Sequence, residues 1–298
     1  MQKLLFVMNP CAGMRKANKL LTDILSVFCQ AGYLVTVHMT LGQGDARDVV
    51  ARLAEKTDIV VCCGGDGTFN ETLSGILQSG VDIPVGYIPA GSTNDFANSL
   101  HLSMDPVQAA KDIVQGTAER FDLGQFNDRY FSYVASFGAF TAASYSTPQS
   151  VKNALGHVAY VLGGIHELSN IHPVHVHLDV DGQSIDGDYI FGAICNCTSV
   201  GGILTLNPSL VDMRDGKFEL LLVRSPKDMV ELGECILSVQ RQQYNSSMMT
   251  FLSGSHIRVE TDPDMPWTLD GERADGSPVI EIDNLQHKYR LMTKAESV

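Results

Sequence analysis

The chain has 298 residues, of which 44% are hydrophobic and 18% are charged, and its formal net charge is −13. This length allows two domains with sizeable cores, and the composition is that of a globular protein. The negative charge argues against a nucleic-acid partner, and no apolar run reaches the roughly 18 residues that span a membrane. Seven cysteines without CxxC spacing indicate reduced thiols and a cytoplasmic enzyme.

The first part of the chain alternates short apolar runs with amphipathic segments of helical period. The predicted strands are Lys3–Met8, Tyr33–Thr40, Ile59–Cys63 and Ile83–Ile88, and the helices between and after them begin near Arg15, Asp45, Thr68, Phe96 and Asp105. Strands that alternate with helices in this way predict a parallel, doubly wound α/β sheet. In such sheets the functional residues lie in the turns after the strands.

The pattern changes after about Phe121, where short alternating β-rich runs become dominant. The predicted strands are Tyr130–Phe137, Val174–Val180, Tyr189–Cys197, Lys217–Arg224, Ser255–Glu260 and Val279–Ile282, with helices at about Ser150–Ser169 and Pro226–Gln242. This pattern predicts an antiparallel β-sandwich. We therefore expect a first domain at residues 1–122 and a second at 123–287, with the tail at 288–298 packing back on the first. We expect the active site in the cleft between the domains.

Three turns of the first domain carry small and acidic residues. They are Asn9–Gly13, Gly64–Thr68 and Gly91–Asp95, and each follows a predicted strand of one sheet. All three should therefore open at the same edge, where exposed amides and a helix N-terminus favour phosphate. Asp66 beside phosphates requires a metal or a water network, while Arg15 and Lys16 offer counter-charge. The plainer interpretation of Gly64–Thr68 is a tight turn that needs glycine for its backbone alone.

Other nucleotide and hydrolase motifs fit less well. Gly42-x-Gly44 has Arg47 where a dinucleotide fingerprint has its third glycine. The Gly216-Lys217 pair lacks the hydroxyl residue of a Walker A motif, and no GxSxG elbow is present.

Two acidic motifs stand out in the second domain. Asp212 and Asp215, three residues apart before a predicted strand, could share a hard cation with backbone carbonyls and water, or could form a surface turn. Asp270 and Glu272 lie in a Leu-Asp-Gly-Glu turn, where a carboxylate that faces a cleft is a candidate general base. An ordinary acidic turn is the alternative there.

Taken together, NPxxG, GGDGT, GSTNDFA, DxxDG and LDGE resemble the diacylglycerol kinase catalytic family, in its soluble bacterial branch of lipid kinases. The resemblance covers nearly the whole chain, with the motifs in family order. GGDG alone also occurs in NAD kinases and phosphofructokinases, whereas the TNDFA stretch separates the lipid kinases from both. This sequence departs from the family pattern at Ser92, which replaces a threonine, and at Asn98, where an arginine is common.

The resemblance implies an ATP-binding α/β domain and a β-sandwich domain for the lipid substrate. It places ATP against Asn9, Gly13, Arg15, Thr40, Gly64, Gly65, Gly67, Thr68, Ser92, Thr93 and Asn94. It assigns the Mg²⁺–water network to Asp66 and Asp95, and the general base to Asp270 with Glu272 near the metal and phosphates. It gives a structural cation, Mg²⁺ or Ca²⁺, to Asp212, Asp215 and the backbone carbonyl of Lys217.

The expected activity is ATP- and Mg²⁺-dependent transfer of the γ-phosphoryl group to a lipid hydroxyl, with diacylglycerol as the first choice. Phosphatidylglycerol, a sphingoid base, an NAD-kinase-like activity and a non-catalytic nucleotide-binding regulator remain open. A lipid substrate requires peripheral contact with a membrane surface, here the inner face reached from the cytoplasm. We expect no nucleic-acid partner, and a homodimer stays open as the assembly.

Overall fold

The structure is a computed structural model that describes residues 1–13, 16–138, 173–200 and 204–294. The chain divides into two compact units, Met1–Leu123 with Gln286–Val298, and Gly124–Leu285. The strands β5 (Thr117–Phe126) and β17 (Val279–Thr293) each contribute residues to both units. The two units are described separately below.

The first unit is built on a parallel sheet. Its elements in chain order are β1 (Lys3–Met8), α1 (Lys16–Lys19), α2 (Leu21–Gln30), β2 (Leu34–Met39), α3 (Asp45–Leu53), β3 (Ile59–Gly64), α4 (Asp66–Ser79), β4 (Pro84–Pro89), α5 (Asp95–Ser99) and α6 (Pro106–Gln115). Hydrogen bonds order the strands β2-β1-β3-β4, all parallel, and the end of β17 adds to β4 through Arg290 and Leu291.

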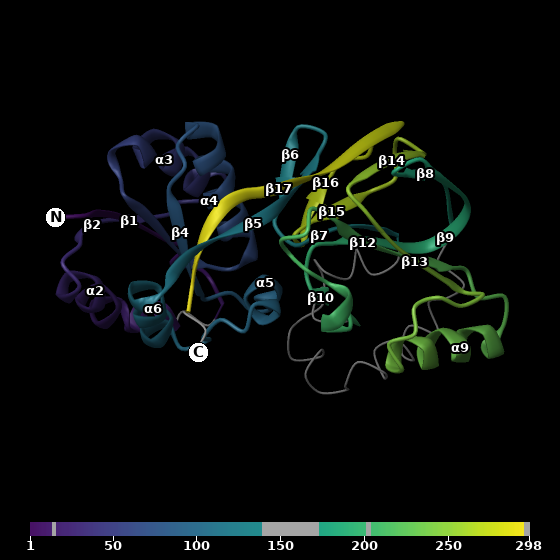
Figure 1. The fold of residues 1–298 in the computed structure, drawn as a ribbon, viewed down its shortest axis with the longest axis horizontal. Helices are drawn as coiled ribbons and strands as arrows, with labels where there is room; N and C mark the ends of the chain where they lie inside the picture. The colour runs from purple at the N-terminus through teal and green to yellow at the C-terminus, as the bar shows by residue number, and fades with distance from the viewer. Residues whose placement is uncertain (14–15, 139–172, 201–203, 295–298) are drawn as a thin grey trace. The chain divides into compact units, whose positions relative to one another are not determined.

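Helices cover both faces of this sheet (Figure 1). Leu4, Phe6 and Met8 of β1 pack with α2 and α6 in one buried cluster, whereas Leu5 and Val7 alternate to the opposite face. In Figure 1, α3 and α4 lie on the side of the sheet away from α2 and α6. The expected doubly wound α/β domain is therefore confirmed.

The second unit consists mainly of antiparallel strands. Besides the shared β5 and β17, they are β6 (Arg129–Phe131), β7 (Val134–Gly138), β8 (Val174–Val180), β9 (Gln183–Cys195), β10 (Ser199–Val200), β11 (Leu204–Thr205), β12 (Phe218–Arg224), β13 (Met249–Gly254), β14 (His256–Thr261), β15 (Trp267–Leu269) and β16 (Glu272–Ala274), with one helix described between them, α9 (Met229–Gln240). The first half of β9 pairs with β8, β8 pairs with β14, and β14 pairs with β17. The second half of β9 pairs with β12 on one side and β7 on the other. In turn, β12 pairs with β13, and β7 pairs with β15.

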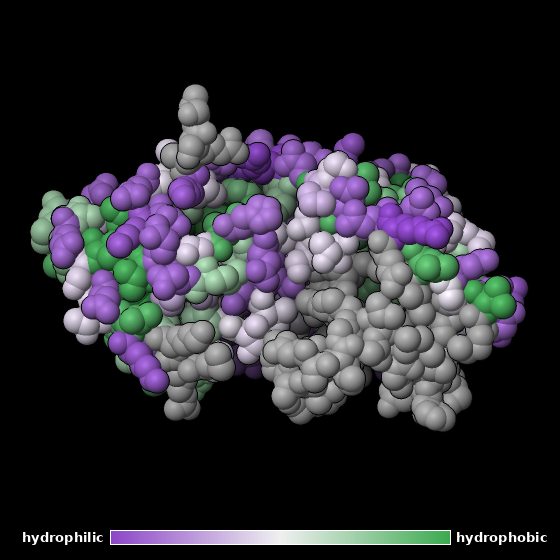
Figure 2. Space-filling model, turned by 90° about the horizontal axis from the view of Figure 1, so that it is seen from below, coloured by the Kyte–Doolittle hydropathy of each residue, from purple (hydrophilic) through white to green (hydrophobic). Residues whose placement is uncertain are grey.

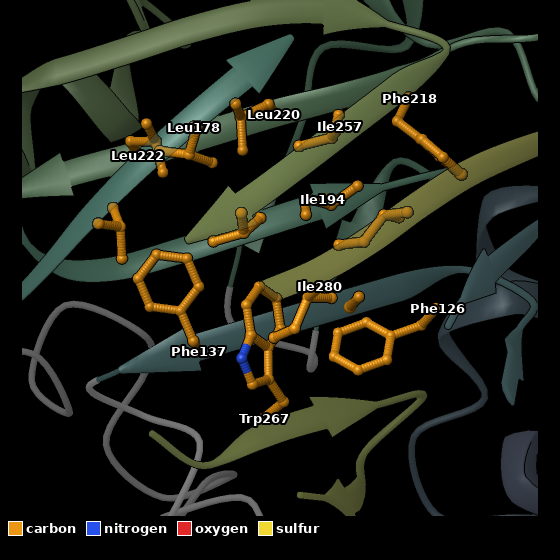
Figure 3. Close-up of a cluster of buried hydrophobic side chains, with 14 of the residues drawn as sticks. Phe126, Phe137, Leu178, Ile194, Phe218, Leu220, Leu222, Ile257, Trp267 and Ile280 are labelled. Carbon is orange, nitrogen blue, oxygen red and sulfur yellow. The ribbon is translucent and has the colours of Figure 1, made fainter. Parts of the chain in front are cut away.

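The long strand β9 thus joins two layers that face each other across one apolar core. Leu178 and Ile257 come from one layer, and Leu220, Phe137 and Trp267 from the other (Figure 3). The Trp267 ring lies 5.0 Å from the Phe137 ring, centroid to centroid, in the tilted arrangement that aromatic pairs favour. This confirms the expected β-sandwich.

Several elements differ from their predicted bounds. The helix expected from Arg15 onward is interrupted at Leu20, so that it forms α1 and α2. The strand expected at Tyr130–Phe137 is broken between β6 and β7, because the backbone N–H groups there bond to a side chain and not to a neighbouring strand. The strand expected at Val279–Ile282 continues to Thr293 as β17. The helix expected at Ser150–Ser169 lies outside the described residues.

The surface of the described residues is mixed in polarity. Figure 2 shows hydrophilic residues interspersed with smaller hydrophobic patches on the face that it presents. The edge strand β2 exposes Leu34, Val37 and Met39, each at 40% or more of its full surface. None of the described helices combines the length and the hydropathy that a membrane crossing requires.

Candidate functional site

The three sequence-predicted turns follow neighbouring strands of the parallel sheet. Met8 of β1 pairs with Cys63 of β3, and Gly64 pairs with Pro89 of β4. The ladder continues beyond the strands, since Asn9 N–H donates to the Cys63 carbonyl at 2.9 Å and Ala90 N–H donates to the Gly64 carbonyl at 2.7 Å. The turns therefore meet at the carboxyl edge of the sheet, the usual ligand position in such folds.

Asn9 ties the first turn to the second. Its amide nitrogen donates to Thr68 Oγ1 at 3.1 Å, and its Oδ1 accepts the Cys11 N–H at 2.9 Å. Asn9 thereby fixes the loop that leads to Gly13 against the first turn of α4. An N–H-rich loop that is held beside a helix N-terminus suits an anionic ligand.

Glycine is required where these turns touch. Gly13 has φ +49°, and a Cβ there would lie 2.4 Å from the Ala90 carbonyl oxygen. A Cβ on Gly91 would lie 2.6 Å from the Gly65 Cα. The three turns therefore approach backbone to backbone at these glycines, where a larger residue would not fit.

Asp66 and Asp95 are brought together at this edge. Both are buried, at 8% and 1% exposure, and the Asp95 N–H donates to Asp66 Oδ2 at 3.1 Å. The Tyr87 hydroxyl donates to Asp66 Oδ1 at 3.4 Å. Burial, together with the Asp66 charge, raises the Tyr87 pKa well above its ordinary value, so the hydroxyl keeps the proton that it donates. The Asp66 carboxylate thus lies beside the backbone of Asp95, and carboxylate, hydroxyl and backbone oxygens of these turns are the kind of donors that fit Mg²⁺.

The other predicted nucleotide residues are arranged around the same edge. Thr40 follows β2, and its N–H donates to the Met8 carbonyl at 2.8 Å. Asn94, at φ +53°, closes the third turn on itself by accepting the Gly91 N–H and donating to the Gly91 carbonyl. Ser92 and Thr93 lie inside that turn, and Gly67 is the second residue of α4. Arg15 lies outside the described residues.

Asp270 occupies the tight turn between β15 and β16 and has φ +51°. Its Oδ2 accepts the Ser132 N–H at 2.6 Å and the Ser132 hydroxyl at 2.9 Å. Its Oδ1 accepts the Tyr133 and Val134 N–H groups at 2.9 and 3.1 Å. Burial raises the Asp270 pKa, while these four donors act in the opposite direction. Each carboxylate oxygen thus has two donors, which is its full lone-pair capacity.

Glu272 lies two residues further on, as the first residue of β16. Its backbone pairs with Leu269 across the hairpin, and the residue is half-buried. The structure therefore places the two acids of this turn in different settings, one closed inside the protein and one closer to the solvent.

The Asp212–Lys217 loop leads into β12. Asp212 Oδ1 accepts the Arg214 N–H at 3.0 Å, and Asp215 Oδ1 accepts the Lys217 N–H at 2.9 Å. The Lys217 carbonyl accepts the Asn284 amide at 3.0 Å and retains a second lone pair. Within the residues that the structure describes, no three or more His, Cys, Asp or Glu side chains form a group that could hold a metal ion. A cation here would therefore depend on backbone carbonyls and water in addition to carboxylates.

Sequence reasoning missed two buried acids. Asp122 is fully buried in β5 and accepts the His287 N–H at 2.8 Å. Glu219 is 2% exposed in β12, and burial raises its pKa to about 8, with the charges of Asp215 and Asp212 acting in the same direction. Each interrupts an apolar strand pattern, which is the signal that could have identified it.

Comparison with known proteins agrees with this geometry. Residues 3–126 match the family model described as "Diacylglycerol kinase catalytic domain", and residues 134–285 match "YegS C-terminal NAD kinase beta sandwich-like domain". A diacylglycerol kinase of Bacillus subtilis is 29% identical over all of this chain and 98% of its own length. One of Staphylococcus saprophyticus is 30% identical over 94% of this chain and 92% of its own length.

Solved structures give the same fold. A diacylglycerol kinase structure from Bacillus anthracis aligns with a TM-score of 0.75 at 21% identity, over all of this chain and 98% of its own. Another structure from that organism reaches 0.82 at 24% identity, over the same shares of the two chains. The sequence relatives and the family models, which together span most of the chain, establish that it belongs to the diacylglycerol kinase family, a family of ATP-using lipid kinases.

Proposed function

We propose that this chain is an ATP- and Mg²⁺-dependent lipid kinase that transfers the γ-phosphoryl group to the hydroxyl of diacylglycerol. The observation that carries the proposal is the buried Asp66 carboxylate, bonded to the backbone N–H of buried Asp95, at the edge where three glycine-bearing turns meet. In this family, that edge is where ATP would bind. Phosphoryl transfer needs positioning and charge neutralisation more than covalent chemistry, and such an edge offers both.

The turn amides around Gly13, Gly64 and Gly65 would bind the phosphates, and Asn9 and Thr68 would hold these amides in place. Asp66 and Asp95 would hold Mg²⁺, directly or through its waters. Bound Mg²⁺ supplies positive charge that neutralises the phosphate oxygens. Asp66 begins the 14-residue helix α4, so the positive end of the helix dipole acts on the same anions.

For the proton acceptor, we propose Glu272 in place of Asp270. The sequence favours Asp270, but all four lone-pair positions of its carboxylate are used by donors from Ser132 to Val134. Removing a proton from a lipid hydroxyl would require Asp270 to give up one of these bonds. Asp270 would instead fix the turn, and Glu272 would accept the proton.

Asp212, Asp215 and the Lys217 carbonyl remain our proposed site for a structural divalent cation, with Mg²⁺ as the first choice. Peripheral binding at a membrane surface follows from the lipid nature of the acceptor. The proposed cation site and the proposed membrane binding are both independent of whether the protein is a homodimer.

A phosphorylation panel tests the proposal. Purified protein is incubated with γ-labelled ATP and vesicles or micelles that contain diacylglycerol, phosphatidylglycerol or a sphingoid base, and separately with NAD. We expect label in diacylglycerol above all other acceptors. Label in NAD alone, or in none of the acceptors, would contradict the assignment, and preference for another lipid would correct the substrate.

The Asp66→Ala variant tests the nucleotide site in the same preparation. Loss of this carboxylate should abolish transfer and weaken Mg²⁺-dependent ATP binding in calorimetry. Asp23→Ala, at an exposed position of α2, is the matched control and should behave like the wild type. Unchanged ATP affinity and activity in Asp66→Ala would contradict this role and would mean that Gly64–Thr68 is a purely structural turn.

A further inference from the structure

Tyr87 of β4 is a buried residue whose polar end lies beside the proposed metal site. The residue is 2% exposed, and its hydroxyl donates to Asp66 Oδ1 at 3.4 Å. The other oxygen of that carboxylate, Oδ2, accepts the Asp95 N–H at 3.1 Å. Both oxygens of Asp66 are therefore held, one by a side chain of β4 and the other by the backbone at the start of α5.

The Tyr87 ring is fixed by the strand pattern and by stacking. A Cβ on Gly86 would meet Ile113 of α6, so Tyr87, the next residue of β4, points to the opposite face of the sheet. There its ring stacks on Phe69 of α4, with the centroids 4.5 Å apart and the planes at 24°. The Phe69 ring stacks in turn on Phe96 of α5, with the centroids 4.7 Å apart. Aromatic stacking thus holds the ring that carries the hydroxyl.

This stack connects the segments that carry the two acids. Phe69 lies in the first turn of α4, which begins at Asp66. Phe96 is the second residue of α5, which begins at Asp95. The stack therefore restrains the first turn of each helix relative to β4, and it places the Tyr87 hydroxyl at a set point beside the Asp66 carboxylate.

The hydroxyl of Tyr87 is not needed for the stack, in which a phenylalanine ring would serve. Removing a hydroxyl from water costs free energy unless it finds a hydrogen-bond partner, and the partner that the described residues provide for Tyr87 is Asp66. Burial, together with the Asp66 charge, raises the Tyr87 pKa, so the group stays protonated and donates to the carboxylate. Asp66, and not packing, therefore accounts for a buried hydroxyl at this position.

We propose that Tyr87 is a positioning residue for Asp66: its hydroxyl and the Asp95 N–H fix the orientation in which the Asp66 carboxylate meets Mg²⁺ or the waters of Mg²⁺. This inference rests on the proposed function, in which Asp66 holds the metal that accompanies ATP. Groups that bond to a metal ligand orient it, and their loss weakens metal affinity by about 10- to 100-fold. Tyr87 suits this task because its ring is stacked and almost closed to solvent.

Calorimetric titration of the full chain with ATP tests this inference, at a series of Mg²⁺ concentrations and in chelator. Tyr87→Phe keeps the aromatic ring and removes the hydroxyl. We expect the Mg²⁺ concentration that gives half of the Mg²⁺-dependent gain in ATP affinity to rise about tenfold or more, while ATP affinity in chelator stays unchanged. In steady-state assays with diacylglycerol, the Mg²⁺ requirement should rise in the same way, and the KM for the lipid should stay at the wild-type value.

Two further variants make the result specific. Tyr33→Phe removes the same hydroxyl from a tyrosine just before β2, at the amino end of the sheet, where its ring lies 6.3 Å from the Phe28 ring. This control should keep the wild-type Mg²⁺ response. In the Asp66→Ala background, Tyr87→Phe should cause little further change in ATP binding, because the hydroxyl acts through that carboxylate.

The outcomes separate the hypotheses. A wild-type Mg²⁺ response in Tyr87→Phe would overturn the role of Tyr87 and leave Asp66 as the metal ligand. Equal weakening of ATP binding with and without Mg²⁺, or a Tyr87→Phe variant that is unfolded, would show a structural role and overturn the inference as well. A wild type whose ATP affinity is indifferent to Mg²⁺ would remove the metal role of Asp66 and the role of Tyr87 together. Lipid phosphorylation is tested separately by the acceptor panel, so failure of this inference is distinguishable from failure of the proposed function.

Discussion

Asp270 and Glu219 are both buried acids of the second unit, and burial raises the pKa of each. Asp270 receives four hydrogen bonds, three of them from consecutive backbone N–H groups, whereas Glu219 has one side-chain donor, the Ser253 hydroxyl. The fold itself therefore compensates the charge of the first carboxylate far more fully than that of the second. Burial alone does not tell how far the charge of an acid is compensated; the number of donors around it does.

The largest effect is expected from Asp270→Ala. It would leave three buried N–H groups and the Ser132 hydroxyl without their acceptor, which costs about 3 kcal/mol or more in the free energy of unfolding. Urea unfolding measures this loss. Asp275→Ala, at an exposed position after the same hairpin, is the control and should change stability by less than about 0.5 kcal/mol. Equal stability of the two variants would mean that Asp270 does not hold β6 and β7 in place.

Glu272→Gln is expected to act on turnover and not on stability. Removing the proposed proton acceptor should lower kcat by about 10²-fold or more, with a free energy of unfolding close to that of the wild type. Steady-state kinetics with diacylglycerol and urea unfolding on the same preparation separate the two effects. A Glu272→Gln variant with near wild-type kcat would return the role of base to Asp270.

Replacing each of the two acids by its isosteric amide extends the comparison of Asp270 with Glu219. Asp270→Asn keeps one acceptor oxygen for four donors, so we expect a loss of about 2 kcal/mol. Glu219→Gln in chelator should show no loss, because Oε2 has no donor among the described residues to give up. Urea unfolding of both variants without Mg²⁺ is the measurement. If both variants lost stability equally, the contrast between the two acids would fail.

The smallest effect is expected from the half-exposed pair of His256 and Asp283, where solvent screens the charges. His256 Nδ1 lies 2.7 Å from Asp283 Oδ1, and this bond raises the His256 pKa. Because the His256 pKa is higher in the folded than in the unfolded protein, protonation of His256 stabilises the fold. This stabilisation is complete below the unfolded-state pKa of about 6.5 and is lost as the pH rises through the folded-state pKa. His256→Gln should therefore cost less than about 1 kcal/mol near pH 5.5 and nothing at alkaline pH. Unfolding at both pH values, with Asp283→Asn as the partner variant, checks this, and a loss that grows with pH would contradict it.

The sequence predicts those parts of the fold whose strands, turns and helices follow from neighbouring residues in the chain. The buried runs of β1 and β3, and the glycine turns after them, are visible in the sequence because strand, turn and helix follow each other within a few residues. A common edge for the three turns then follows from the parallel topology, and the register of β1, β3 and β4 places the turns side by side.

What the sequence could not predict depends on contacts between distant segments. The donors of Asp270 lie at Ser132–Val134, far earlier in the chain, and their diversion to a side chain is what separates β6 from β7. The sequence shows that Glu219 interrupts the apolar run of β12, but not what surrounds its carboxylate. Its burial, and the charge that Asp212 and Asp215 bring to it, exist only once the strands have paired.

Single-turnover phosphoryl transfer tests the central assignment most directly. Wild-type protein in excess over γ-labelled ATP is mixed with Mg²⁺ and diacylglycerol vesicles, and the label is followed into the lipid and aqueous phases. The account predicts that the label appears in diacylglycerol with wild type, and that Asp66→Ala and Glu272→Gln fail to transfer it at a comparable rate. Label that appears only as free phosphate, or transfer that both variants carry out at the wild-type rate, would contradict it.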